Sequence, residues 1–230
     1  MHDILHQLKR AAHDAGRPTP RLLAVSKTKD ETAVAELALQ GQTAFGENYV
    51  QEAMAKCAAM ASTAAAGRSL EWHLIGHLQS NKAADAARLF DWVQTVDRPK
   101  LVTALARHRG ELAQRPPLNV LIQVNIDDEA SKHGCAPDDV PALAGAIAAE
   151  PALRLRGIMV IPTPHADPEL RRPAFAQAKA LFDAVAAQHG AAVDTLSMGM
   201  SDDYPIAIAE GATMVRIGTA LFGARSRPQG

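Results

Sequence analysis

A lysine ends the first apolar segment of the sequence, where a reactive amine could do chemistry. Residues 22–25 read Leu-Leu-Ala-Val, and Ser26 and Lys27 follow directly. The ordinary interpretation of such a lysine is a solvated loop residue. If Lys27 instead lies against an apolar wall, burial lowers the pKa of its ammonium group and makes a neutral amine available. That amine can attack an aldehyde and form a Schiff base. Lys29 is expected to be a solvated loop charge.

A second group of candidate residues lies within residues 197–223. Ser201 precedes a short helical pattern, and Gly218 and Thr219 follow Arg216 at the end of the last apolar segment. Backbone N–H groups, hydroxyls and an arginine suit a phosphate dianion, and glycine lets the backbone approach closely. Taken alone, the glycines also fit ordinary turns. A reactive lysine and a phosphate-binding group together are the two anchors of pyridoxal phosphate (PLP).

Metal chemistry has weaker support in this sequence. His73 and His77 are four residues apart, but WHLIGH lacks the glutamate of a zinc-binding HExxH helix. We therefore favour packed or pocket-lining histidines. The acidic run at residues 126–134 lacks the alternating ligand spacing of a calcium loop. Cys57 and Cys135 have no CxxC pairing, so neither a disulfide nor a metal site is expected.

Eight short apolar segments must position these residues. Most are dense in Val, Ile and Leu, which is typical of parallel strands buried on both faces. The expected strands are 21–26, 43–47, 71–76, 92–96, 119–125, 155–162, 194–199 and 214–221. In parallel-stranded folds the site lies at the carboxyl ends of the strands, where Lys27, Asn48, Ser201 and Arg216 are found.

Helical patterns separate the segments. Asp30 is a candidate N-cap for a helix that follows it, and Pro173 is expected to set the start of a helix that ends at Gly190. After FGEN, a stripe of apolar residues is expected to face the core: Val50, Met54, Cys57 and Ala58. The alternation predicts one (β/α)8 barrel over residues 1–230, with an N-terminal helix in place of a full closing helix. An open doubly wound sheet is less favoured because no GxGxxG occurs.

Composition narrows the function classes. Of the 230 residues, 47% are hydrophobic and 21% charged, which indicates a globular chain. The net charge of −1 argues against a nucleic-acid partner. No apolar run reaches the ~18 residues of a membrane span, and the start lacks the apolar core of a signal peptide. We expect a cytoplasmic protein and, with only 4% aromatic residues, a monomer.

The sequence resembles the pyridoxal phosphate homeostasis proteins, the YggS/PROSC family. The motifs that carry the resemblance span nearly the whole chain: AVSKTK (24–29), FGENYVQE (45–52), WHLIGHLQSNK (72–82), IQVNI with SKHG (122–134), LRGIMVIP (155–162) and SMGMSDDYPIAIAEGATMVRIGTALFG (197–223). The resemblance implies a single barrel of the alanine-racemase N-terminal type, the fold-type III class, that holds PLP as an internal aldimine. It places the Schiff base on Lys27 and phosphate contacts on Ser201, Gly218 and Thr219. It also implies that Arg216 lies near the phosphate or the pyridine nitrogen, and that Asn48 is a pocket residue.

The resemblance favours a protein that carries or buffers PLP, with no catalytic or metal-ligating residue assigned and with PLP-dependent apoenzymes as recipients. A small amino-acid racemase or lyase is the alternative. Such an enzyme would need Tyr49, Tyr204 or a histidine such as His77 as a second acid–base group.

Overall fold

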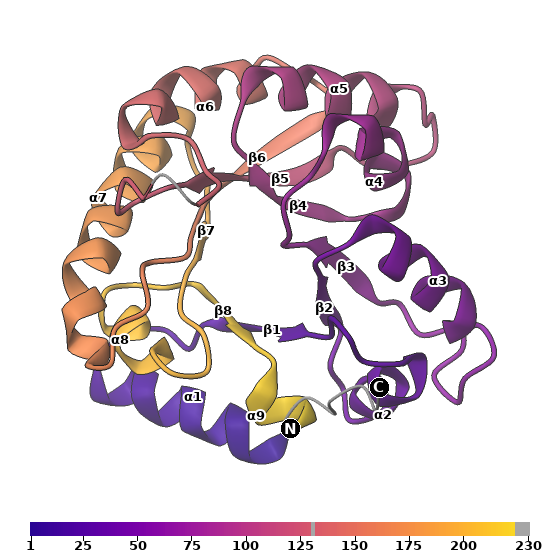
Figure 1. The fold of residues 1–230 in the computed structure, drawn as a ribbon, viewed down its shortest axis with the longest axis horizontal. Helices are drawn as coiled ribbons and strands as arrows, with labels where there is room; N and C mark the ends of the chain where they lie inside the picture. The colour runs from indigo at the N-terminus through magenta and orange to yellow at the C-terminus, as the bar shows by residue number, and fades with distance from the viewer. Residues whose placement is uncertain (130–131, 224–230) are drawn as a thin grey trace.

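Eight parallel strands close into a barrel in the computed structural model, which describes residues 1–129 and 132–223. The strands are β1 (Arg21–Val25), β2 (Ala44–Glu47), β3 (Glu71–Leu74), β4 (Trp92–Val96), β5 (Leu118–Val124), β6 (Leu153–Val160), β7 (Thr195–Ser197) and β8 (Met214–Ile217). They follow one another around the barrel in chain order, and β1 pairs with β8 from Arg21↔Met214 to Ala24↔Ile217. The prediction of a (β/α)8 barrel is confirmed (Figure 1).

Helices connect the strands and form the outer layer. They are α1 (His2–Asp14), α2 (Glu31–Leu39), α3 (Val50–Met60), α4 (Ala83–Leu89), α5 (Pro99–Gly110), α6 (Val140–Ala148), α7 (Arg172–His189), α8 (Tyr204–Ala209) and α9 (Thr219–Phe222). Short 3-10 turns at Ser80–Lys82, Pro137–Asp139 and Pro168–Arg171 precede α4, α6 and α7. Asp30 caps α2, since its carboxylate accepts a hydrogen bond from the Ala33 N–H at 2.9 Å. Helix α7 begins at Arg172, one residue before Pro173, and ends before Gly190, as expected.

The N-terminal helix covers the place where a closing helix would lie. Helix α9, after β8, has only four residues. Helix α1 runs along the outside of the barrel beside α8 and below β8 and β1 (Figure 1). It buries Ile4, Leu8 and Ala12 there. A hydrogen bond of 3.2 Å from the Tyr204 hydroxyl to Gln7 joins α8 to α1.

Seven of the eight expected strands agree with the structure to within two residues at each end. Two expectations about individual elements are wrong by more than this. The last strand ends at Ile217 rather than at residue 221, because the chain enters α9 at Thr219. Helix α3 buries Val50, Ala53, Lys56 and Met60, whereas Met54 is 42% exposed. The buried face of α3 includes a charged residue because its ion-pair partner, Glu47, lies beneath the helix. Ser131 and the residues after Gly223 lie outside the described residues.

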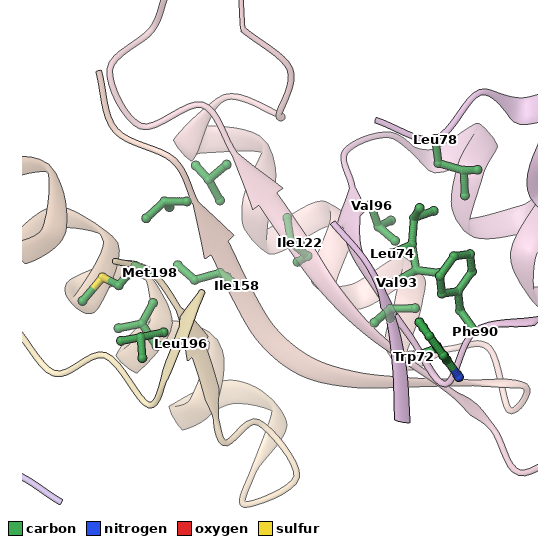
Figure 2. Close-up of a cluster of buried hydrophobic side chains, with 14 of the residues drawn as sticks. Trp72, Leu74, Leu78, Phe90, Val93, Val96, Ile122, Ile158, Leu196 and Met198 are labelled. Atoms are coloured by element: carbon green, nitrogen blue, oxygen red, sulfur yellow. The ribbon is translucent and has the colours of Figure 1, made fainter. Parts of the chain in front are cut away.

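Most of the core lies between the strands and the surrounding helices. Figure 2 shows part of this layer as aliphatic and aromatic side chains that pack between neighbouring strands and helices. The labelled members are Trp72, Leu74, Leu78, Phe90, Val93, Val96, Ile122, Ile158, Leu196 and Met198. Smaller clusters fill the barrel interior, among them Trp92, Leu121 and Met159. Within the described ranges, no helix has the length and apolarity needed to cross a bilayer.

Candidate functional site

A cavity of about 760 Å³ opens at the carboxyl ends of the strands. Its lining contains all six residues predicted from the sequence: Lys27, Asn48, Ser201, Arg216, Gly218 and Thr219. Lys27 follows β1, Asn48 follows β2, and Ser201 lies in the loop after β7. These residues converge because the carboxyl ends of parallel strands meet at one face of a barrel. Three apolar side chains complete much of the wall: Val25, Ile75 and Ile161.

The reactive-lysine candidate is half-buried at this cavity, two residues after β1 ends. Gly218 approaches β1 closely, since a Cβ placed on it would lie 3.3 Å from the Val25 carbonyl oxygen. A larger residue at 218 would push the loop after β8 away from the β1 end. Lys29 differs from its prediction as a solvated charge. It is half-buried, and its ammonium group donates a hydrogen bond to the Phe222 carbonyl at 3.2 Å.

Arg216 is fixed from below the cavity. Its side chain is only 4% exposed. One terminal nitrogen, Nη1, donates to Ser197 Oγ at 2.9 Å, and Nη2 donates to the Val160 carbonyl at 2.8 Å. Burial lowers the pKa of Arg216 to about 10, and the negative charge of Asp203 opposes that shift. The guanidinium therefore remains a cation at neutral pH, in one orientation.

A chain of hydrogen bonds continues from Ser197 through the barrel interior. Ser197 Oγ donates to Gln94 Oε1 at 2.7 Å, and Gln94 Nε2 contacts His73 Nδ1 at 2.9 Å. His73 Nε2 lies 2.5 Å from Glu71 Oε1, and Glu71 pairs with Arg21 at 2.6 Å. Since the arginine at the cavity can only donate, each link donates toward Glu71, and the proton of His73 lies on Nε2.

The charges along this chain follow from burial. Desolvation is the main reason that the pKa of His73 falls below 6.5, so its imidazole is neutral. Burial also opposes ionisation of Glu71, but the hydrogen bond from His73 and the charge of Arg21 outweigh it and lower the pKa of Glu71 to about 2. Sequence reasoning missed Gln94 and Ser197. A glutamine inside the apolar run WVQTV was the available signal, but its partners lie on other strands.

The loop after β7 is braced by a buried carboxylate. Asp203 accepts a hydrogen bond from the Met200 N–H at 2.6 Å and one from Arg171 Nη1 at 2.6 Å. Ser201 lies between Met200 and Asp203 in this loop and is half-buried at the cavity. Asp203 thus holds the segment that presents the Ser201 hydroxyl.

The acid–base candidates of the enzyme alternative lie elsewhere. Tyr49 and His77 line a neighbouring cavity of about 360 Å³, where the His77 ring stacks on His133 at 3.8 Å. Tyr204 lines a third cavity, beside α1. Among the residues that the structure describes, none of these three lines the cavity of Lys27.

Comparison with known proteins defines the class of this molecule. Residues 1–226 match the family model of the alanine racemase N-terminal domain. The molecule is therefore a barrel of the alanine racemase N-terminal type.

More similar proteins narrow this class. A pyridoxal phosphate homeostasis protein of Pseudomonas aeruginosa is 51% identical over 224 residues, covering 96% of this chain and 93% of the relative. One from Escherichia coli K12 is 48% identical over 234 residues, covering 98% of each. The solved structure of PipY from Synechococcus elongatus, with PLP bound, is 36% identical with a TM-score of 0.80, covering 95% of this chain and all of PipY. The chain belongs to the pyridoxal phosphate homeostasis protein family.

Proposed function

We propose that this chain binds PLP in the cavity at Lys27 and carries or buffers it in vitamin B6 homeostasis. The observation that carries the proposal is that one cavity holds a lysine amine, a buried arginine and a group of hydroxyl and glycine residues. The cavity volume of about 760 Å³ lies in the usual range for a small-molecule site, and its amine, guanidinium and hydroxyl groups suit an aldehyde that carries a phosphate. The PipY structure from Synechococcus elongatus, which has PLP bound, supports the same ligand.

Each residue has a separate task in this proposal. When bound, the cofactor would supply an aldehyde, and a neutral lysine amine is the protein group that reacts covalently with an aldehyde, with release of one water. Lys27 would provide that amine. Ser201, Thr219 and the backbone at Gly218 would hold the phosphate. Arg216 would place a fixed positive charge at the cofactor, near its phosphate or its pyridine nitrogen.

Three apolar side chains and one amide complete the proposed site. Val25, Ile75 and Ile161 line the cavity and would give the bound cofactor apolar contacts. Asn48 lines the cavity after β2 and would offer a polar contact to the ring substituents. We place the protein in the cytoplasm, with PLP-dependent apoenzymes as the recipients of the cofactor.

Trapping with borohydride tests the proposal. Wild-type protein mixed with PLP should show a visible absorption band, and reduction should leave a stable adduct on the peptide that contains Lys27. Lys27→Ala should lose both the band and the adduct. Lys9→Ala, which removes an exposed lysine of α1, is the matched control and should keep both. An adduct that maps mainly to another lysine would contradict the assignment.

A carrier also differs from a racemase in a measurable way. A racemase must move the α-proton on both faces of its substrate, and Tyr49, Tyr204 and His77 do not line the cavity. We therefore expect L- and D-alanine incubated in D2O with the PLP-loaded protein to show no catalytic α-deuterium exchange by NMR. Repeated turnover, well above one exchange per protein molecule, would support the racemase alternative.

A further inference from the structure

Two glutamates of the FGENYVQE motif (45–52) contact the residues on either side of Lys27, although only Asn48 of this motif lines the cavity. Glu47 ends β2, and Glu52 lies in the first turn of α3. Lys56 lies one helical turn after Glu52 and is buried. The three charged side chains meet the segment 26–28, which carries Lys27.

Two of these side chains, Glu47 and Lys56, hold Ser26, the residue before Lys27. Ser26 Oγ donates a hydrogen bond to Glu47 Oε1 at 2.6 Å. Lys56 Nζ donates to the Ser26 carbonyl at 2.8 Å and to Glu47 Oε1 at 2.5 Å. Glu47 is completely buried, and desolvation raises its pKa although Lys56 and Ser26 act in the opposite direction. Burying such a pair is costly, so its contacts with the Ser26 hydroxyl and carbonyl require an explanation.

The third charged side chain, Glu52, holds Thr28, the residue after Lys27. Thr28 has φ of 64°, a left-handed conformation that is unfavourable for a β-branched residue. Its backbone N–H donates to Glu52 Oε1 at 2.6 Å. Glu52 in turn lies 3.3 Å from Lys56 Nζ. One lysine therefore links the two carboxylates that hold the chain on either side of Lys27.

We propose that Glu47, Glu52 and Lys56 form a clamp that fixes the backbone around Lys27 and so holds its amine at the cavity. The three are positioning residues, since none of them lines the cavity. This inference rests on the proposed function of Lys27. The clamp also explains why α3 turns a lysine toward the barrel.

Glu52 is the residue to test. Its side chain is 29% exposed, whereas removing either member of the Glu47–Lys56 pair would leave a buried charge uncompensated and destabilise the whole fold. The variants are Glu52→Ala, Glu52→Gln and the double variant Glu52→Ala/Thr28→Gly. Glu36→Ala, at an exposed position of α2, is the control.

Two measurements are made on each variant. The first is amide hydrogen exchange at Thr28 in the protein without PLP. The second is PLP affinity, from the amount of borohydride-trapped adduct on Lys27 at increasing PLP concentration. Glu52→Ala should speed exchange at Thr28 and weaken binding about tenfold, the loss expected for one charge-assisted hydrogen bond. Glu52→Gln should retain most of the affinity, because its amide oxygen still accepts from Thr28.

The double variant separates strain from general damage. Glycine adopts positive φ without a steric penalty, so Thr28→Gly should restore part of the affinity that Glu52→Ala loses. Exchange and affinity in Glu52→Ala that match Glu36→Ala would overturn the clamp. So would a loss of affinity with unchanged exchange at Thr28. If wild-type protein bound no PLP, the proposed function would fail, while exchange at Thr28 would still test the clamp.

Discussion

Two side chains inside the barrel, Arg216 and His73, show how burial decides charge residue by residue. Arg216 keeps its charge because its ordinary pKa is so high that burial lowers it only to about 10. His73 starts from 6.5, so burial keeps it neutral. The two are joined through Ser197 and Gln94, and a neutral His73 is what allows Gln94 to donate to it. The orientation of Arg216 thus depends on the protonation state of a histidine across the barrel.

The native state should lose stability as pH falls below 6.5, because unfolded protein then protonates His73 while folded protein does not. The free energy of unfolding should fall by up to about 1.4 kcal/mol per pH unit from this group. His73→Gln should flatten that slope at some cost in overall stability. Urea unfolding of wild type and His73→Gln between about pH 5 and 8 measures how the free energy of unfolding changes with pH.

The control for this prediction is His6→Gln, which changes an exposed histidine of α1 and should keep the wild-type slope. Glu47 contributes the opposite sign, because its raised pKa lowers stability as pH rises above 4.5. That contribution is present in every variant and cancels in the comparison. An equal slope in wild type and His73→Gln would show that His73 titrates normally.

At the scale of elements, the strands could be predicted and the polar interior could not. All eight apolar segments became strands because strands buried on both faces need continuous aliphatic residues. Because these runs are apolar on both faces, the sequence pattern does not show which residues face the barrel interior. Gln94 finds its partners on β3 and β7, at positions distant in sequence. The six candidate residues of the proposed site line one cavity because each lies in, or within a few residues after, the carboxyl end of β1, β2, β7 or β8.

Helix α3 shows the limit of reading a helix by itself. An apolar stripe predicts that Met54 faces the core, but Met54 is 42% exposed and Lys56 is buried. The helix is rotated so that Lys56 reaches Glu47 and the Ser26 carbonyl. Neither partner belongs to α3, so only the packed structure reveals this face. The proposed clamp around Lys27 could not be predicted from the sequence for the same reason.

At the scale of the whole molecule, closure of the barrel joins the two ends of the chain. Strand β1 pairs with β8, and α1 packs beside α8. The proposed site also takes residues from both ends, since Lys27 follows β1 while Arg216 and Thr219 come from β8 and α9. Neither half of the chain contains a complete barrel or a complete site. Residues 1–230 are therefore expected to unfold as one domain.

We expect a single thermal transition that is the same by far-UV circular dichroism and by tryptophan fluorescence. We expect the protein to be a monomer, so the midpoint of its transition should be independent of protein concentration. PLP at about 100 times its Kd should raise stability by about 2.7 kcal/mol, which for a chain of this size shifts Tm by roughly 5–10 °C. Lys27→Ala should show a much smaller shift at the same PLP concentration, because it lacks the covalent anchor. Two separate transitions would contradict a single domain, and a midpoint that rises with protein concentration would contradict a monomer.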